Sequence, residues 1–394
     1  MNARSTAVVH LESHVADLQH SKRSLPLRIV IAGGGTGGHL YPGIAIAEAF
    51  KQHDPRTDVR FIGSTTGIEA QVLPREGWQS HLLPASRLRG GGPWVFARGA
   101  AKIPVGIASC IRFFLDFRPQ LVIGVGGYAS GAAMLAAALC DIPRVIQEQN
   151  TIPGMTNRIT ARLSERVYAN QGVVSEWFGD TPIRTFGTPI RHSIRESLLR
   201  ARGQRLRPTA GSPFRILVVG GSQGAQFLNQ QVPELVTECI RRSQGIAVVH
   251  QTGVKDLDTT RKEYEKRNIS ADVRAYINDM AEAYTNADLI LCRAGASTLA
   301  EITAVGLPAL LVPFPFAAYD HQTANAHTLQ RAGAARVVEQ SRWETAHVAD
   351  IIVELATHPL QWSQMAKRSL EIGNPDAANQ IVNDCIELLS RLDR

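Results

Sequence analysis

Short apolar runs alternate with longer stretches of mixed polarity along most of the chain. In the first half, the apolar runs are 28–32, 59–62, 121–125, 144–147 and 167–169. In the second half, they are 215–219, 247–251, 273–276, 289–292 and 309–312. Buried parallel strands have this continuous apolar character, and amphipathic stretches between them are typical of crossover helices. The pattern therefore predicts an α/β protein with parallel sheets.

Each half opens in the same way, with an apolar strand, a glycine turn and a helix: LRIVIAGGGTGGH in the first and FRILVVGGSQGAQFLN in the second. A chain of 394 residues exceeds one typical core, so we predict two Rossmann-like domains. The composition becomes polar and Arg-rich after about 196, and we place the boundary near Gly187. The predicted parts are a disordered extension (1–26), a first domain (27–187), a second domain (188–364) and a final amphipathic helix (about 365–394).

The composition is that of a soluble globular protein, with 44% hydrophobic and 20% charged residues. A net charge of +7 suits phosphorylated substrates, anionic lipid or nucleic acid, although an enzyme without a polyanionic partner fits it equally well. The five scattered cysteines include no Cys-x-x-Cys pair, which argues against a disulfide framework and against a zinc site. Residues 1–26 lack the apolar core of a secretory signal, and no apolar run approaches the roughly 20 residues of a spanning helix.

Four glycine turns follow predicted strands, at 33–38, 126–131, 220–224 and 295–298. Free N–H groups at such turns and at helix N-termini attract anions. The first turn satisfies Gly-x-Gly-x-x-Gly, but dinucleotide binding needs an acid after the next strand, where this chain has Gly63-Ser64-Thr65. No Gly-Lys-Ser/Thr follows, so a P-loop is excluded too. Four turns in two domains favour a cleft that handles one or more diphosphates.

Seven motifs carry a resemblance, and they occur in the order GGGTGGHLYPGIAIAE, GVGGYASG, EQN, GTPIR, GGSQGA, CRAGASTLAE and DHQTANA. From about Leu27 to the C-terminus, the chain resembles the bacterial MurG-type family of N-acetylglucosaminyltransferases. The resemblance implies a GT-B fold, in which two Rossmann-like domains face each other across a cleft and the last helix returns to the first domain. One position departs from the family pattern, which often has His where this chain has Gln147.

The activity that the resemblance implies is the inverting transfer of GlcNAc from UDP-GlcNAc to the muramoyl hydroxyl of undecaprenyl-diphospho-MurNAc-pentapeptide. Such an enzyme would work as a peripheral protein at the cytoplasmic face of the cell membrane, without a cofactor or a bound metal. The implied partners are the two substrates, an anionic membrane surface, and proteins of cell-wall synthesis and division, but no nucleic acid.

The resemblance also implies a set of substrate-binding residues. Arg191 would meet the donor diphosphate, Glu301 the ribose hydroxyls and Gln322 the sugar. The expected UDP-GlcNAc site comprises Thr36, Gly37, Gly38, Asn150, Arg191, Ser222, Ile277, Ala296, Ser297, Thr298, Leu299, Ala300, Glu301 and Gln322. The expected loops for the acceptor diphosphate contain Gly35, Gly126, Gly127 and Tyr128.

An inverting transfer needs a base for the acceptor hydroxyl. His39 follows the first glycine turn, and imidazole titrates near neutral pH, so it is the first candidate base. Glu148 is the second, and the sequence does not choose between them. The Asp-x-Asp motif of metal-dependent sugar transferases occurs at Asp256–Asp258, but inside a polar helical stretch that we expect to face solvent.

Apolar and basic residues are interleaved at 88–102, a pattern that suits anionic lipid. Trp94, Phe96, Arg98 and Lys102 form the predicted membrane patch. Two other functions stay open at this point. One is a GT-B transferase with a different lipid acceptor, such as diacylglycerol, and the other is a non-catalytic protein that binds nucleotide sugars.

Overall fold

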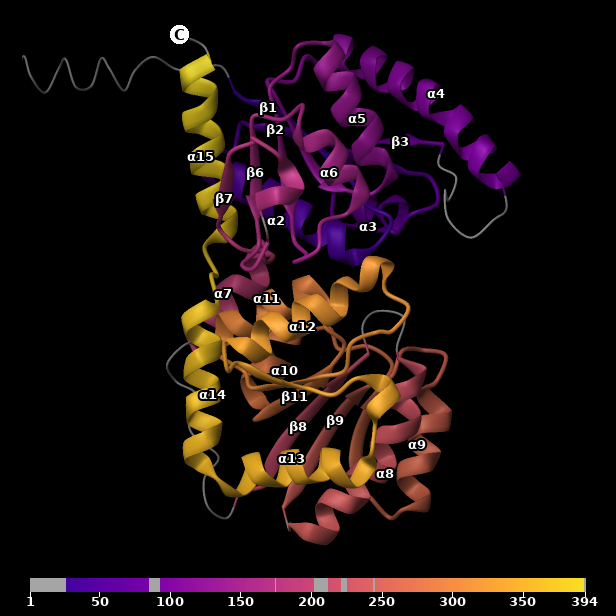
Figure 1. Ribbon diagram of the computed structural model, residues 1–394, viewed down its shortest axis with the longest axis vertical. Coiled ribbons are helices and arrows are strands. Elements are labelled where there is room, and N and C mark those ends of the chain that lie inside the picture. Colours follow the sequence, from indigo (N-terminus) through magenta and orange to yellow (C-terminus); the bar gives the residue numbers. More distant parts are fainter. Residues whose placement is uncertain are drawn as a thin grey trace, which may run out of the picture.

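The computed structural model describes residues 26–84, 93–173, 175–201, 212–220, 225–243 and 245–392. Within these residues, the chain forms two parallel sheets, each in its own α/β lobe (Figure 1). The seven-stranded sheet has the order β3-β2-β1-β4-β5-β6-β7, and the six-stranded sheet has the order β10-β9-β8-β11-β12-β13. In both sheets the strand order reverses beside the first strand, which is where α/β proteins bind ligands.

The first lobe is built from the described residues up to β7 and from the last helix. Its strands are β1 (Arg28–Gly33), β2 (Asp58–Ser64), β3 (Gln79–Leu83), β4 (Leu121–Gly126), β5 (Arg144–Glu148), β6 (Arg166–Ala169) and β7 (Ile183–Thr185). Its helices are α2 (Gly37–His53), α3 (Glu69–Arg75), α4 (Pro93–Phe117), α5 (Tyr128–Leu139), α6 (Met155–Ala161) and α15 (Ala377–Leu392).

The second lobe follows the linker, residues 186–191, which joins β7 to the first helix of this lobe. Its strands are β8 (Phe214–Val219), β9 (Ile246–Gln251), β10 (Ala271–Arg274), β11 (Leu289–Cys292), β12 (Ala309–Leu311) and β13 (Ala335–Val337). Its helices are α7 (His192–Ala201), α8 (Gln226–Arg242), α9 (Leu257–Lys266), α10 (Met280–Asn286), α11 (Ala296–Val305), α12 (His321–Arg331), α13 (Thr345–Thr357) and α14 (Pro359–Ile372).

All ten strands predicted from the apolar runs are present, and every pair of neighbouring strands is parallel. The predicted strand at 273–276 is displaced, because β10 ends at Arg274. Three strands were not predicted: β3, β7 and β13. Each lies at the edge of its sheet and is only partly buried, so it lacks the continuous apolar run of a central strand.

Helices cover both faces of the first sheet. On one face, α2 and α15 pack together through buried residues such as Phe50, Ile381 and Leu389. On the other face, α4 and α5 bury Phe114 and Met134. The last helix therefore crosses back from the second lobe and runs along the first (Figure 1).

Loops at the carboxyl ends of the two sheets meet each other. The N–H of Thr151, after β5, donates to Asn325 Oδ1 on α12 at 2.8 Å. Asn325 Nδ2 in turn donates to Asn150 Oδ1 at 3.2 Å and to the carbonyl of Ala294, after β11, at 3.3 Å. The carboxyl ends of both sheets thus border a common interdomain region.

Candidate functional site

His39 lies in the first turns of α2, with its ring packed against the loop after β4. Its Nδ1 lies 2.9 Å from the carbonyl oxygen of Val125 and also contacts the side-chain amide of Gln149. A carbonyl oxygen only accepts hydrogen bonds, so Nδ1 carries the proton and Nε2 carries the free lone pair. Burial lowers the pKa of His39, and the Val125 bond opposes this effect. At neutral pH the imidazole is therefore uncharged, with Nε2 able to take a proton.

Several glycines of the first lobe make room for other parts of the protein. A Cβ on Gly126 would lie 2.8 Å from His39 Cε1, and a Cβ on Gly127 would lie 2.7 Å from the carbonyl oxygen of Gly34. Both glycines have positive φ, +100° and +87°. Close packing of the two loops therefore explains these two glycines without a ligand.

In the first glycine turn, Gly35 and Gly38 border open space. Gly35 has φ +89° and no atom within 4 Å of an added Cβ, and Gly38 has only Thr36 Oγ1 at 3.7 Å. Gly37 is helical, and an added Cβ would lie 3.1 Å from the ring of Tyr41. The N–H of His39 donates to the carbonyl of Thr36 at 3.2 Å, which leaves the N–H groups of Gly37 and Gly38 without an acceptor among the described residues. They are the groups of this turn that can bind an anion.

Glu148 is fully buried at the end of β5, and both of its carboxylate oxygens are occupied. Oε1 accepts hydrogen bonds from the backbone and side chain of Asn150, at 2.9 and 3.3 Å. Oε2 accepts from the N–H of Gly154 at 3.0 Å and from Asn157 Nδ2 at 2.8 Å. Burial raises the pKa of Glu148, and these bonds act against the rise. This carboxylate organises the loop from β5 to α6, which carries Asn150.

Arg191 lies in the linker, between groups of both lobes. Its guanidinium carbon is 4.5 Å from the centre of the Tyr41 ring on α2. Its charge also acts on Glu301 of α11, whose pKa it pulls down against the larger upward effect of burial. Arg191 Nε is buried and has no hydrogen-bond partner within the described residues. The linker thus presents an unsatisfied cationic donor where the two lobes meet.

The first turns of α11 carry several of the predicted donor residues. Ala296 and Leu299 are buried, whereas Ser297, Thr298, Ala300 and Glu301 are partly exposed. Ser297 Oγ is buried without a partner among the described residues. Besides the charge of Arg191, Glu301 meets Tyr284 of α10, whose hydroxyl donates to Glu301 Oε2 at 2.7 Å.

A pocket of about 630 Å³ opens beside this helix. Thr298 and Gln322 line it, together with Gly220 after β8, Arg293 after β11 and Phe314. The Gln322 side chain is held there because its Oε1 accepts the N–H of Phe314 at 3.0 Å. The pocket therefore gathers residues from three of the loops at the carboxyl end of the second sheet. Ser222, which belongs to the first of these loops, lies outside the described residues.

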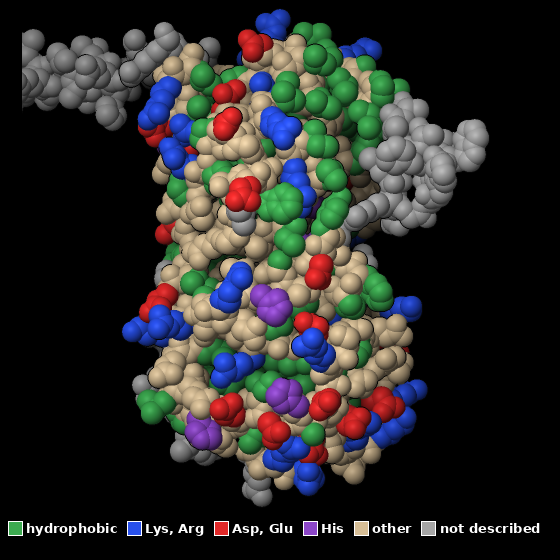
Figure 2. Space-filling model, in the orientation of Figure 1, with side chains coloured by type: hydrophobic (Ala, Val, Ile, Leu, Met, Phe, Trp, Pro, Cys, Tyr) green, Lys and Arg blue, Asp and Glu red, His purple; other side chains and the backbone are tan. Residues whose placement is uncertain are grey.

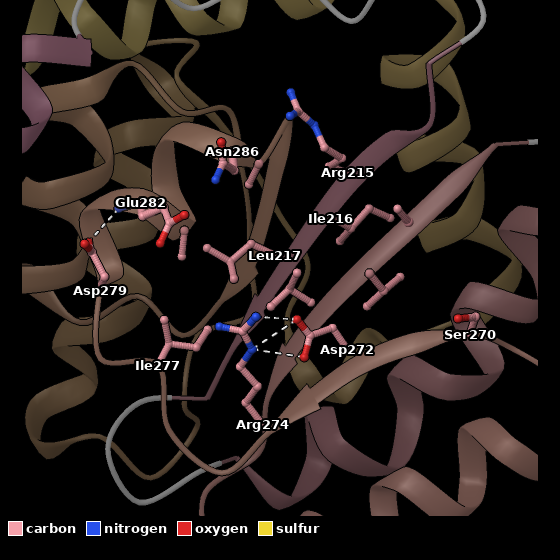
Figure 3. A pocket seen from close by; sticks show the side chains of 15 residues that line it. Arg215, Ile216, Leu217, Ser270, Asp272, Arg274, Ile277, Asp279, Glu282 and Asn286 are labelled. Atoms are coloured by element: carbon pink, nitrogen blue, oxygen red, sulfur yellow. Dashed lines mark hydrogen bonds and ion pairs between the residues drawn. The ribbon is translucent and has the colours of Figure 1, made fainter.

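A second pocket, of about 410 Å³, lies on the face of strands β8 to β10 (Figure 3). Ile277 lines it and points toward its centre, and an Asp272–Arg274 ion pair closes one side. The N–H of Ile277 donates to Gln251 Oε1 at 3.3 Å. Of the predicted donor residues that the structure describes, only Ile277 lines this pocket, and its N–H has a protein partner.

The remaining sequence predictions lie away from these pockets. Asp258 is exposed on α9 and pairs with Arg261 at 3.7 Å, as expected for a solvated face, while Asp256 accepts a bond from Asn229 at 2.9 Å. The predicted membrane residues fall in α4, but the side chains of Trp94, Phe96, Arg98 and Lys102 lie outside the described set. Among the described residues, no helix combines the length and apolar character needed to cross a membrane.

Sequence reasoning missed three residues that shape the site. Tyr284 looks like an ordinary apolar residue of a short helix, and Asn325 like an ordinary polar residue within DHQTANA. Glu69 looks like a surface acid at a helix start, yet it is fully buried. The spacing of Glu69 after the glycines at 63 and 67 was the available signal.

Comparisons with known proteins agree along nearly the whole chain. Residues 29–169 match the model of the glycosyltransferase family 28 N-terminal domain, and residues 215–381 match that of the C-terminal domain. A relative from Geobacter sulfurreducens is 39% identical over 360 residues, which are 91% of this chain and 98% of the relative. Another, from Syntrophus aciditrophicus, is 40% identical over 371 residues, which are 93% of this chain and 99% of the relative.

Both relatives carry the name UDP-N-acetylglucosamine--N-acetylmuramyl-(pentapeptide) pyrophosphoryl-undecaprenol N-acetylglucosamine transferase. The crystal structure of Acinetobacter baumannii MurG superposes with a TM-score of 0.73 at 29% identity, covering 91% of this chain and 98% of that one. A putative UDP-N-acetylglucosamine 2-epimerase from Listeria monocytogenes has a TM-score of 0.65 at 14% identity, which shows the fold alone.

Two parallel-sheet lobes, with loops converging from their carboxyl ends, define a protein of the GT-B fold. Within that class, the near-full-length identity to its relatives decides the family. The chain belongs to the MurG family of N-acetylglucosaminyltransferases, in glycosyltransferase family 28.

Proposed function

We infer that this protein transfers GlcNAc from UDP-GlcNAc to the muramoyl hydroxyl of undecaprenyl-diphospho-MurNAc-pentapeptide (lipid I), which yields lipid II for peptidoglycan synthesis. The observation that carries this function is the 39–40% identity to transferases of that name over nine-tenths of the chain. The protein is a UDP-GlcNAc-dependent hexosyltransferase.

For the donor, we propose a site on the second lobe between Glu301 and the 630 Å³ pocket. Tyr284 occupies Glu301 Oε2, whereas Oε1 accepts no hydrogen bond within the described residues and is available to a ribose hydroxyl. Gln322 and Thr298 line the pocket where the sugar would lie. The backbone loop that contains Ser222 would contact the nucleotide.

For the leaving group, the support comes from Arg191. Its buried Nε lacks a partner among the described residues, and a guanidinium binds phosphate oxygens with a fixed charge. The first turn of α11 adds helix N–H groups at the same border between the lobes. Together these groups would stabilise the departing UDP as the glycosidic bond breaks.

For the acceptor, we propose that His39 is the general base. UDP-GlcNAc is an α-glycoside and the product linkage is β, so a direct displacement accounts for the inversion. His39 Nε2 would take the proton of the muramoyl hydroxyl as that oxygen attacks the anomeric carbon. Glu148 has no oxygen free of protein hydrogen bonds, so we assign it to positioning Asn150. The amides at the starts of α2 and α5, near Gly35, Gly127 and Tyr128, would face the acceptor diphosphate.

A turnover assay tests this function. Purified protein with UDP-GlcNAc and a lipid-linked muramoyl-pentapeptide should release UDP and form the disaccharide, whereas diacylglycerol in place of that acceptor should give no product. Product with diacylglycerol alone would indicate a different lipid acceptor. Binding of UDP-GlcNAc without UDP release from either acceptor would indicate a non-catalytic protein.

The acceptor carries a long lipid, so we propose that the first lobe docks on the cytoplasmic face of the membrane. Met155, Ile159 and Leu163 are exposed at four-residue spacing on and just after α6. Arg162 is exposed beside them, and Arg158 stacks on the Trp177 ring at 3.6 Å. Figure 2 shows apolar side chains, with basic ones among them, gathered on this lobe over α5 and α6. This pattern suits an anionic lipid surface.

A vesicle-binding assay tests whether this surface, and not another part of the protein, contacts the membrane. The double variant Met155→Ser/Ile159→Ser should sediment less with anionic vesicles and keep its activity on a short-chain soluble acceptor. Val254→Ser/Leu360→Ser, which removes exposed apolar residues from outside the first lobe, is the matched control. Equal sedimentation of both variants would contradict docking through α6. Association with proteins of cell-wall synthesis and division stays a prediction from the resemblance.

A further inference from the structure

Glu69, at the start of α3, is a fully buried carboxylate that holds two loops together. Its Oε2 accepts the N–H of Gly35 at 2.7 Å, in the loop between β1 and α2. Its Oε1 accepts the N–H and the hydroxyl of Ser64, both at 2.8 Å, at the end of β2. No Lys, Arg or His of the described chain forms an ion pair with it. Hydrogen bonds from the protein's own loops alone stabilise this anion.

The neighbouring glycines form a cage around this side chain. An added Cβ would lie 2.4 Å from Glu69 Cδ at Gly34, 2.5 Å from Cγ at Gly63 and 2.1 Å from Oε2 at Gly67. Real Cβ atoms do not approach other atoms so closely. Gly63 and Gly67 do not have positive φ, so their backbones do not require glycine. Their lack of a side chain is explained by the Glu69 carboxylate.

The loop that Glu69 holds also sets the position of His39. Gly34, next to the bonded Gly35, donates its N–H to the carbonyl of Gly126 at 3.3 Å. His39 lies one turn further along, with Nδ1 on Val125 and its ring against Gly126. A chain of direct contacts therefore runs from Glu69 through the turn before α2 to the proposed base.

The Gly35 amide has a further consequence for the acceptor. An N–H that donates to a carboxylate at 2.7 Å is not available to a phosphate oxygen. The Glu69 carboxylate is therefore the acceptor for the Gly35 N–H, in place of a ligand. The acceptor diphosphate is left with the amides of Gly37 and Gly38 on α2 and with the first-turn amides of α5.

We propose that Glu69 is a positioning residue for transfer, holding the turn before α2 so that His39 and the first-turn amides of α2 face the acceptor. This inference rests on the proposed function, because it assigns the base to His39. Burial has the largest effect on the pKa of His39 and lowers it; the Val125 bond raises this pKa, His321 of α12 lowers it, and the charge of Glu69 raises it. Removing that charge should therefore lower the imidazole pKa.

The test compares Glu69→Gln with Glu238→Gln, which removes a carboxylate from an ion pair on α8 of the second lobe. For Glu69→Gln, kcat should fall roughly tenfold to hundredfold, the cost of a small misplacement of a reacting group. UDP affinity should be unchanged, and the His39 pKa measured by NMR should be lower than in the wild type. Glu238→Gln should change none of the three.

Gly67→Ala is a second way to remove the hydrogen bonds of Glu69, because the added methyl group would displace the Glu69 carboxylate. It should lower kcat as Glu69→Ala does, and the double variant should be no worse than either single one. Gly106→Ala, where an added Cβ meets Ala132 at 3.4 Å, is the control glycine.

Two results would overturn the proposal. One is a Glu69→Gln variant with wild-type kcat and an unchanged His39 pKa. The other is additive loss of activity in the Gly67→Ala/Glu69→Ala pair. If the wild type itself shows no transfer, the proposed function fails, and the NMR titration still decides whether Glu69 acts on His39.

Discussion

The Tyr284 hydroxyl donates to Glu301 Oε2 at 2.7 Å, and neither side chain has another hydrogen-bond partner within the described residues. Tyr284 is fully buried in α10, whereas Glu301 lies partly exposed on α11. The tyrosine therefore fixes the rotation of the carboxylate, and Oε1 accepts no hydrogen bond within the described residues. A carboxylate held in this way is suited to accept bonds from two neighbouring hydroxyls.

Glu301→Ala should raise the KM for UDP-GlcNAc and leave kcat nearly unchanged, since the lost bonds are present in both the ground and transition states. Charge-assisted bonds to the ribose hydroxyls are worth about 2–3 kcal/mol, or roughly a 30- to 150-fold change. Steady-state kinetics at varied UDP-GlcNAc concentration measure this change in KM. An unchanged KM in a folded variant would remove Glu301 from the donor site.

Tyr284→Phe removes one hydroxyl and should shift the pH dependence of donor binding. Burial already raises the pKa of Glu301, and the Tyr284 bond acts to lower it. Without that bond the pKa rises further, so the binding carboxylate is lost at a higher pH as the solution is acidified. The measurement is kcat/KM for UDP-GlcNAc against pH. An acid limb at the wild-type position would contradict the positioning role of Tyr284.

His39→Ala should lower kcat about 10²- to 10⁴-fold if the imidazole is the general base. Because burial lowers the pKa of His39, the wild-type rate should fall only below the ordinary imidazole range, as Nε2 becomes protonated. The variant should lose that acid limb. His347→Ala, at an exposed position of α13, is the control. Near-normal kcat for His39→Ala from pH 6 to 9 would return the assignment to Glu148.

The fold followed from the sequence because central parallel strands carry apolar runs that local pattern detects, while edge strands such as β7 do not. The choice between His39 and Glu148 could not follow in the same way. It depends on bonds from Gly154 and Asn157 that occupy the Glu148 carboxylate, and these bonds exist only in the folded loop.

The role of the glycine turns 33–38 and 126–131 could not be predicted from the sequence either. The sequence predicts a site for a diphosphate at both turns, but the close neighbours of Gly34 and Gly126 are Glu69 and His39. Both neighbours reach the glycines through tertiary packing of separate loops. Composition and spacing alone do not distinguish a glycine that admits a ligand from one that admits a side chain of the same protein.

Gln147→Met should stabilise the protein. Gln147 is fully buried at the end of β5, and neither atom of its side-chain amide has a partner within the described residues. A buried unsatisfied polar group costs about 1–3 kcal/mol, and Met has nearly the same shape without those groups. Urea denaturation should show a higher free energy of unfolding for the variant. A lower value would indicate that ordered water or another group satisfies the amide.

The helix that returns to the first lobe, α15, is held there by polar contacts as well as by apolar ones. Asp384 of α15 pairs with Arg166 of β6 and accepts the Tyr168 hydroxyl at 2.8 Å, and both Arg166 and Tyr168 are buried. Asp384→Ala would leave the Arg166 charge buried and unpaired, at a cost of about 3–5 kcal/mol. Urea denaturation followed by tryptophan fluorescence measures the loss.

Glu387→Ala is the matched control on the same helix, because the Glu387–Arg391 pair is exposed and such pairs contribute about 0–1 kcal/mol. If Asp384→Ala costs no more than this control, the ion pair does not hold α15 on the first sheet. The apolar contacts of Ile381, Cys385 and Leu389 would then account for its attachment. UDP affinity should survive in both variants, since the proposed donor site lies on the second lobe.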